Sequence, residues 1–287
     1  MSAVRRGAAI LALGTGFATG CTEPDEVVGE CGTGHVQTWV VSSLTFARRD
    51  GGVVSGFDVD GHDSGPSGDA EGCGLPDLES PRGVPGVDNN FSALVPILEA
   101  TEAVAAESLI KQSIASGELL LTLSFDGIDS WMDDDCVDFT LGRAGGVPLV
   151  APDGTLLEDQ TLGAHPTIAS VSAEGFSEGG RISAGGLAFN LPLDVLNAEL
   201  DFQVTRGQFQ VQKRYDGALT GVMGGVIPIR QITEILERDD VNLQQFVPIV
   251  LSAADVRDEA GECSLLSLGF ELEAIPAFLE PEPVPPG

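Results

Sequence analysis

The segment LDFQVTRGQFQVQK, residues 200–213, decides the fold predicted for this chain. Apolar and polar residues alternate along Leu200–Val204 and again along Phe209–Lys213, and Thr205-Arg206-Gly207 lies between the two runs. Alternation with a period of two predicts β-strands, and a short glycine-containing connection between two strands predicts a hairpin. We therefore expect Ala198–Val204 and Gln208–Tyr215 to pair as antiparallel strands.

Similar patterns extend from this pair toward both ends of the chain. They predict further strands, at Val36–Val41, Gly51–Val59, Glu118–Phe125, Val137–Leu141, Thr167–Ser172, Ile182–Leu191 and Leu266–Glu273. Apolar residues at helical spacing predict helices, at Phe91–Leu98, Leu109–Ile114, Ile229–Leu236 and Val241–Ala254. Strands in runs and helices in clusters, without regular alternation, indicate the α+β class. The expected fold is a mainly antiparallel β-sheet with a few helices, and a sandwich is the arrangement considered for the sheet.

The composition limits the class of partner. Of the 287 residues, 44 are Asp or Glu and 14 are Lys or Arg, which gives a net charge of −30, while 43% of the residues are hydrophobic. A chain of this length and apolar content can bury a core. Because the negative charge repels nucleic-acid phosphates, we expect no nucleic-acid partner. The surplus of carboxylates favours divalent cations or basic partners instead.

The N-terminus carries the pattern of an export signal. Arg5 and Arg6 precede the small and apolar run Ala8–Phe17, which is too short to cross a bilayer as a helix. The next residues, Ala18-Thr19-Gly20-Cys21, resemble the lipobox of bacterial lipoproteins. This resemblance implies that residues 1–20 are a signal peptide and that Cys21 becomes the lipidated N-terminus. An ordinary signal peptide with a chance cysteine is the alternative.

The same resemblance implies a location and a division of the chain. Thr22, rather than aspartate, follows Cys21, and under the sorting rule of enteric lipoproteins this favours the outer membrane over the inner one. We expect a protein held in the bacterial cell envelope by its lipid anchor, with residues 21–30 as a tether. Residues 31–278 are expected to form a single globular domain with a long acidic loop at 58–90, followed by a proline-rich tail at 279–287.

Four cysteines remain once Cys21 is assigned to lipid. They are Cys31, Cys73, Cys136 and Cys263, an even number in a chain that is expected to be exported. This predicts two disulfides, and none of the four lies in a CxxC motif that would indicate a zinc or redox site. Three pairings are open. We prefer Cys73 with Cys136, which would join two acidic loops, and Cys31 with Cys263, which would join the chain ends.

Oxygen ligands are concentrated in the acidic loop. The run Asp58-Val59-Asp60-Gly61-His62-Asp63 resembles the DxDG loops of dockerin and thrombospondin calcium repeats, although His62 prevents a match to an EF-hand. Calcium is coordinated by six to eight oxygens. The resemblance implies a calcium site with these candidate ligands: Asp58, Asp60, Asp63, Asp69, Asp77, Asp88 and Asn89. The alternative is a solvated turn whose aspartates accept hydrogen bonds from their own backbone.

Catalytic motifs are weak in this sequence. Gly175-Phe176-Ser177-Glu178-Gly179 formally matches the GxSxG elbow of hydrolases, but the required strand, turn and helix context is missing and no histidine follows the serine. The second acidic run, Asp126–Asp138, suggests a metal-screened loop or a plain acidic surface rather than a general acid and base. We name no catalytic residue and favour a protein that is not an enzyme.

These observations lead to two hypotheses of function. The first is a membrane-anchored envelope or surface lipoprotein that acts as a non-catalytic binding or structural module, with calcium as its candidate stabilising ion. The second is an envelope carrier of an apolar ligand such as a lipid. The carrier hypothesis draws on Leu219–Pro228, whose small apolar residues could line a cavity or could allow close backbone packing.

Overall fold

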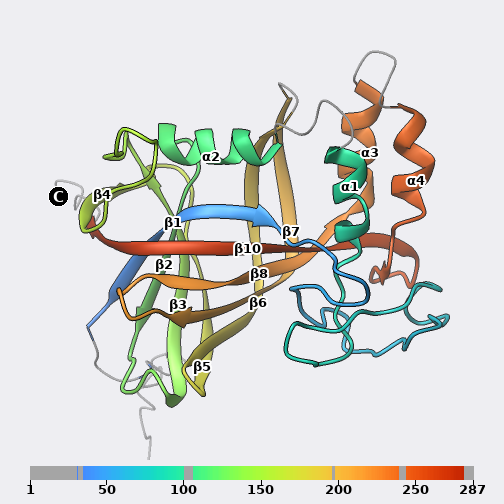
Figure 1. Cartoon of the computed structure of the whole chain (residues 1–287), viewed down its shortest axis with the longest axis horizontal. Coiled ribbons are helices and arrows are strands. Elements are labelled where there is room, and N and C mark those ends of the chain that lie inside the picture. The colour runs from blue at the N-terminus through green and yellow to red at the C-terminus, as the bar shows by residue number, and fades with distance from the viewer. Residues whose placement is uncertain (1–30, 32–34, 100–105, 196–197, 239–243, 281–287) are drawn as a thin grey trace, which may run out of the picture. The chain divides into compact units, whose positions relative to one another are not determined.

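The alternating segments form long strands in the computed structural model, which describes residues 31, 35–99, 106–195, 198–238 and 244–280 (Figure 1). The chain divides into two units, residues 1–30 and 31–287, and all the described residues belong to the second. The predicted signal peptide, Cys21, the tether and residues 281–287 of the predicted tail lie outside the described residues.

Ten strands of the described chain form one sheet. Eight of them, paired antiparallel throughout, close into a barrel in the order β1-β2-β3-β5-β6-β7-β8-β10-β1. Their bounds are β1 (Gln37–Phe46), β2 (Leu120–Asp126), β3 (Asp133–Gly145), β5 (Val171–Glu178), β6 (Arg181–Val195), β7 (Ala198–Lys213), β8 (Leu219–Pro228) and β10 (Cys263–Glu280). The short strands β4 (Gln160–Ala164) and β9 (Val256–Arg257) pair with members of this ring.

The helices are short and lie outside the ring of strands. They are α1 (Val95–Glu99), α2 (Ala106–Ser116), α3 (Ile229–Arg238) and α4 (Val247–Leu251), with 3₁₀ turns at Asn90–Ala93 and Gln244–Phe246. The helix α2 packs against β1 and β6, and α3 packs against α4 (Figure 1). Within the described ranges, no helix has both the length and the apolar character needed to span a membrane.

The closed barrel contradicts the predicted fold class. The protein is mostly β, with eight strands in a closed antiparallel barrel, and is neither an α+β protein nor a sandwich. The barrel closes because strands far apart in the sequence pair with each other. Strand β1 pairs with β10, from Thr38 opposite Ala277 to Phe46 opposite Phe270. An alternating strand has one apolar face in a sandwich and in a barrel alike, so the pattern does not distinguish the two.

The predicted hairpin at Thr205–Gly207 is also wrong. Residues 198–213 form the single strand β7, which pairs with β6 on one side and β8 on the other. The register with β8 shifts between Thr205 and Gln208, and Arg206 has a φ of 50°. The turn-like residues therefore form a bulge inside a strand. A bulge bends its strand and redirects its side chains, and here the Arg206 guanidinium donates to the Val59 carbonyl at 3.4 Å and the Arg257 carbonyl at 2.9 Å.

One predicted strand is absent, and one segment with two open interpretations adopts one of them. Gly51–Val59 is not a continuous strand, because within it only Val53 and Phe57 form isolated bridges, with partners in the loop. Leu219–Pro228, in contrast, is the strand β8. Its glycines allow close backbone packing: a Cβ atom on Gly225 would lie 2.6 Å from Val204 Cγ1 and 2.8 Å from the Thr205 carbonyl oxygen.

The barrel interior is filled by large apolar side chains. Phe125, Phe139 and Phe209 form a row of packed rings whose centroids are 5.3 and 5.1 Å apart, and Phe189 continues it at 5.8 Å from Phe209. Leucine, isoleucine and methionine side chains of the barrel strands are almost completely buried in the same core, among them Leu120, Leu123, Ile182, Leu191, Leu219, Met223 and Leu266. An eight-stranded barrel is narrow enough for its own side chains to fill it.

Two disulfides are present, and their pairing differs from the preferred one. Cys31 is bonded to Cys136 with a Cα–Cα distance of 5.2 Å, and Cys73 is bonded to Cys263 with a distance of 5.8 Å. The preferred pairing of Cys73 with Cys136 is therefore wrong. The acidic loop that contains Cys73 is joined to the start of β10, while Cys136 near the start of β3 is joined to the beginning of the described chain.

Gly221 in β8 provides a test of this strand pairing. A Cβ atom there would lie 2.3 Å from the carbonyl oxygen of Gln210 in β7, and backbone atoms in a sheet cannot move away cheaply. We expect Gly221→Ala to lower the free energy of unfolding by about 1 to 3 kcal/mol, measured by urea denaturation. Gly163→Ala in β4 is the matched control, because nothing lies within 4 Å of its Cβ position. Equal effects of the two variants would contradict the pairing.

Candidate functional site

Three aspartates of the acidic loop converge on one point. One carboxylate oxygen from each of Asp58, Asp60 and Asp88 lies within 4.8 Å of the others. Asp58 is exposed and Asp60 is half-buried, whereas Asp88 is only 3% exposed. Asp88 is brought to the other two by a local antiparallel bridge, in which its backbone N–H donates to the Phe57 carbonyl at 2.9 Å. We call Asp58, Asp60 and Asp88 the aspartate triad.

Each member of the triad uses one oxygen to accept hydrogen bonds from the loop backbone. Asp58 Oδ1 accepts from the Gly61 N–H at 2.6 Å, and Asp60 Oδ1 accepts from the His62 N–H at 2.9 Å. Asp88 Oδ2 accepts from the Val59 N–H at 2.8 Å and the Asp60 N–H at 3.3 Å. These bonds fix the carboxylates. Within the described part of the chain, the second oxygen of each carboxylate makes no such bond.

The triad is electrostatically strained in the absence of a cation. The pKa of Asp88 is raised to about 9, mainly by burial and in addition by the nearby carboxylates of Asp60, Asp255 and Asp77. Burial also raises the pKa of Asp60, with contributions from Asp77 and Asp58. Among the described residues, no lysine or arginine forms an ion pair with a member of the triad. A buried carboxylate without a counter-ion is costly, so this site favours a proton or a metal ion.

A further buried carboxylate, Asp255, lies close to the triad and was not predicted from the sequence. It is 6% exposed, and its oxygens accept from the Ser267 N–H at 2.8 Å and from the Ser267 hydroxyl. Burial raises its pKa to about 6. Asp255 begins the acidic run Asp255–Glu262, which contains Gly261, but this run is far from the acidic loop in the sequence, and nothing in it indicates that Asp255 joins the triad. Only the folding of β10 beneath the loop brings Asp255 near Asp88.

The other predicted ligands have different places in the loop. Asp77 Oδ2 accepts from the Ser64 N–H at 2.6 Å and Asp63 Oδ1 accepts from the Gly65 N–H at 2.9 Å, so each holds a neighbouring turn. Asp69 faces His62, with Oδ2 at 2.8 Å from Nε2. The Asn89 amide donates to the Ser55 carbonyl at 2.8 Å. The structure thus brings together Asp58, Asp60 and Asp88 of the predicted set, with Asp77 near enough to affect their pKa values.

The loop that carries the triad is held to the barrel by contacts on both sides. Gln208 Nε2 donates to the Asp58 carbonyl at 2.9 Å, next to the bond from Arg206 to the Val59 carbonyl. The Arg257 guanidinium donates to the Ala70 carbonyl, and the Cys73–Cys263 disulfide lies in the same region of chain. The bulge in β7 and the start of β10 therefore position the acidic loop.

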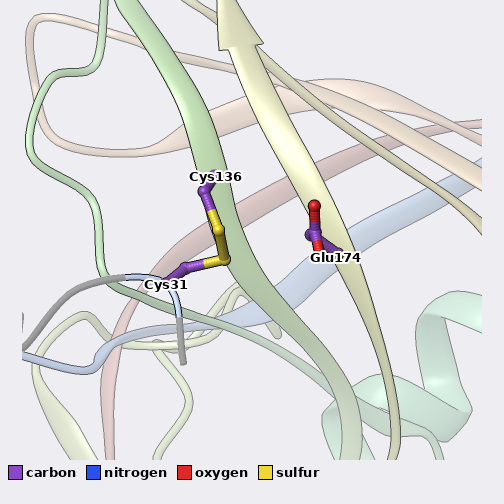
Figure 2. Close-up of side chains that lie close together, drawn as sticks. All are labelled: Cys31, Cys136 and Glu174. Carbon is purple, nitrogen blue, oxygen red and sulfur yellow. A yellow bond between two sulfur atoms is a disulfide. The ribbon is translucent and has the colours of Figure 1, made fainter. Parts of the chain in front are cut away.

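A second group of metal-ligand residue types does not form a metal site. Figure 2 shows Cys31 and Cys136 joined by their disulfide, with Glu174 on the neighbouring strand β5. A metal ion is coordinated by thiolates, and the sulfurs of a disulfide carry no such charge. This group is therefore a structural crosslink beside an exposed glutamate.

The catalytic motifs weighed in the sequence have structural roles. Ser177 of the GxSxG match lies within β5, is 4% exposed, and its hydroxyl donates to the Trp131 carbonyl at 2.7 Å. In the second acidic run, Asp134 Oδ2 accepts from the Asp129 N–H at 2.7 Å, and such bonds to the backbone lower the pKa of Asp134. Neither site offers an activated nucleophile or a poised acid.

Comparison with known proteins finds no matching family model, no matching curated protein and no matching solved structure.

Proposed function

We propose that this protein is a lipid-anchored module of the bacterial cell envelope, non-catalytic in function, whose barrel is stabilised by a calcium ion bound at Asp58, Asp60 and Asp88. The observation that carries the calcium proposal is the convergence of three carboxylates around the buried Asp88. Asp58, Asp60 and Asp88 would hold the ion, and its charge would offset the repulsion among them.

The chemistry of the donors supports calcium over other metals. All three ligands are carboxylates, and oxygen donors suit Ca²⁺ or Mg²⁺, whereas zinc and copper sites in proteins are usually built with histidine or cysteine. Asp58 is exposed, so water can complete the coordination sphere from the solvent side. Calcium accepts an irregular coordination geometry, which is compatible with a loop held by its own backbone bonds. Magnesium requires a nearly ideal octahedron of ligands.

The anchoring proposal is supported by the lipobox resemblance at Cys21 and by the attachment of residue 31. The Cys31 N–H donates to Asp138 Oδ2 at 3.1 Å, and the disulfide joins Cys31 to Cys136 at the beginning of β3. A force on a tether at residues 21–30 would therefore be transmitted to the barrel wall through a covalent bond.

The carrier hypothesis is the second candidate. Closed antiparallel barrels can enclose a small apolar ligand, which is compatible with this architecture. The interior described above is occupied by packed rings and aliphatic side chains, and this favours the non-catalytic module over the carrier. Mass spectrometry of lipid extracted from the purified protein distinguishes them, because a carrier retains a stoichiometric lipid besides its anchor.

Thermal unfolding tests the calcium proposal directly. We expect calcium to raise the melting temperature of the wild type and excess chelator to reverse the rise, because a ligand that binds only the folded state stabilises it. An unchanged melting temperature at millimolar calcium would overturn the proposal.

Cys21→Ser tests the anchoring proposal. We expect the wild type to fractionate with envelope membranes and to carry the mass of acyl chains, whereas the variant has neither property, because several acyl chains are needed for stable anchoring. The measurements are membrane fractionation in a bacterial host and intact-mass analysis. Cys31→Ser is the control, because it also removes a cysteine near the N-terminus but leaves the lipobox intact. Membrane association of Cys21→Ser at the wild-type level would contradict the proposal.

A further inference from the structure

A polar groove of about 440 Å³ crosses the outer face of the barrel wall, and no member of the aspartate triad lines it. It is lined by residues of β1, β10, β8, β7 and β6, which are consecutive neighbours in the ring, and by Ser55, which precedes the acidic loop. The bulge in β1 between Val41 and Ser43 contributes to its shape, because it turns Ser43 into register with Glu273.

The pairing register places the lining side chains in two rows across the strands. The first row is Ser43, Glu273, Thr220, Gln212 and Arg181, each opposite the next. The second row is Thr45, Glu271, Val222 and Gln210, and its register continues to Ser183 on β6, which does not line the groove. Five strands spaced at about 4.8 Å make each row about 19 Å long. We call these the open row and the braced row.

The braced row is occupied by contacts within the protein. Ser55 Oγ donates to Glu271 Oε1 at 2.8 Å, and Arg82 from the acidic loop donates to Gln210 Oε1 at 2.8 Å. Gln210 Nε2 donates in turn to Ser183 Oγ at 3.1 Å. Ser55, and Arg82 of the acidic loop, therefore occupy hydrogen-bonding groups of the braced row.

Most hydrogen-bonding side chains of the open row have no partner among the described residues. In the part of the chain that the structure describes, the side chains of Ser43, Thr220, Gln212 and Arg181 form no hydrogen bond or ion pair with protein. Glu273 makes one wide contact, 3.7 Å from Oε1 to Arg214 Nη1. Ser43, Thr220 and Arg181 are nevertheless only partly exposed. Gln212 and Glu273 are exposed. The row thus combines partly sheltered and exposed donors and acceptors that are available to a ligand.

The chemistry of the two rows limits the ligand class. Glu271 and Glu273, in a chain with a net charge of −30, disfavour anions. Peptides that bind by strand addition need a free sheet edge, which strands paired on both sides do not present, and polyproline segments need aromatic rings, which the groove lacks. An amphipathic helix needs an apolar groove, whereas hydroxyl, amide and charged groups dominate here.

We propose that this groove binds a neutral oligosaccharide through the open row. Sugar hydroxyls both donate and accept hydrogen bonds, as do the Ser43 and Thr220 hydroxyls and the Gln212 amide, while Arg181 only donates and Glu273 only accepts. The row is long enough to contact several sugar units. Recognition uses the hydroxyl edges of the sugar rings and does not involve stacking on aromatic side chains.

Isothermal titration of the full-length protein with maltohexaose, cellohexaose and chitohexaose tests the proposal. We expect at least one of the three to bind, and the double variant Gln212→Ala/Thr220→Ala to bind that sugar at least tenfold more weakly. The matched control is Thr140→Ala on β3, outside the groove, where the Thr140 hydroxyl is bonded to Ser172 Oγ at 2.8 Å. Melting temperatures of all the proteins establish that they are folded.

Three outcomes would overturn the proposal. The first is the absence of binding to all three sugars, and the second is binding that the double variant retains at the wild-type level. The third is binding of a decalysine peptide that depends on Gln212 and Thr220 while no sugar binds, which would assign the groove to a basic partner. None of these outcomes bears on the calcium site, because no member of the aspartate triad lines the groove.

Discussion

Asp88→Asn is expected to melt at a higher temperature than the wild type in chelator at pH 8, and to show no calcium-dependent rise. On folding in chelator at this pH, the wild-type Asp88 must take up a proton or bury its charge, because its pKa is about 9 in the folded protein. The neutral Asn side chain avoids this cost, and its amide oxygen can still accept from the Val59 N–H. Since one pKa unit corresponds to about 1.4 kcal/mol and 1 kcal/mol moves the melting temperature of a chain this size by about 2 to 4 °C, we expect a rise of about 5 °C or more.

The pH dependence follows from the raised pKa values. The pKa is about 9 for Asp88 and about 6 for Asp255 in the folded protein, against an ordinary value of 3.8. Both groups retain a proton in the folded state at pH values where the unfolded chain has lost it. Their favourable contribution is complete below about pH 4 and is lost as the pH rises toward 9. In chelator, the melting temperature of the wild type should therefore fall between pH 5 and pH 9, and Asp88→Asn should reduce this slope.

Asp69→Asn is the matched control for both effects. It removes one charge from the same acidic loop, but Asp69 faces His62 and lies outside the aspartate triad. If calcium acted only by screening the net charge, the two variants would respond to it equally. Scanning calorimetry with calcium, with magnesium and with chelator distinguishes these cases. A full calcium response in Asp88→Asn would remove the basis of the proposed site.

Cys73→Ser/Cys263→Ser is expected to be the most destabilising change outside the core. This disulfide joins residues 190 positions apart in the sequence, and the entropy of the unfolded chain predicts a loss of about 4 to 5 kcal/mol when so long a loop is released. Because the same crosslink holds the acidic loop near β10, the variant should also bind calcium more weakly. Urea denaturation and calcium titration measure the two effects.

Cys31→Ser/Cys136→Ser is the matched control for calcium binding. It removes a disulfide of shorter separation, 105 residues, which joins Cys31 to Cys136 in β3 and includes no residue of the acidic loop. We expect it to lower the free energy of unfolding but to leave calcium affinity unchanged. Peptide mapping without reduction should find Cys73 linked to Cys263, and a peptide that links Cys73 to Cys136 would contradict the structure.

The sequence predicted individual strands better than the way they join. The alternation at Val137–Leu141 and Ile182–Leu191 falls within β3 and β6, and the helical spacing at Leu109–Ile114 falls within α2. Local patterns gave the wrong prediction where the same short segment is compatible with two structures. Thr205-Arg206-Gly207 suits a turn, but it forms a bulge because β7 continues between two neighbours whose pairing compensates for the interruption.

The candidate site was predictable in part. The clustering of Asp58 and Asp60 in a glycine-rich run indicated oxygen ligands, and Asp88 was included because it lies in the same acidic loop. Asp69 was included on the same grounds, yet it faces His62. Composition identifies which residues can be ligands, whereas the bridge between Phe57 and Asp88 decides which of them meet.

Sequence alone determined the resemblance to an export signal, the even number of cysteines, the acidic character of the loop and the period-two pattern of most strands, because each of these is local in the chain. Only the tertiary structure decided the closure of the barrel, the pairing of the cysteines, the convergence on Asp88 and the two rows of the groove. Each of those depends on which distant segments become neighbours, and that is set by the packing of the whole apolar interior.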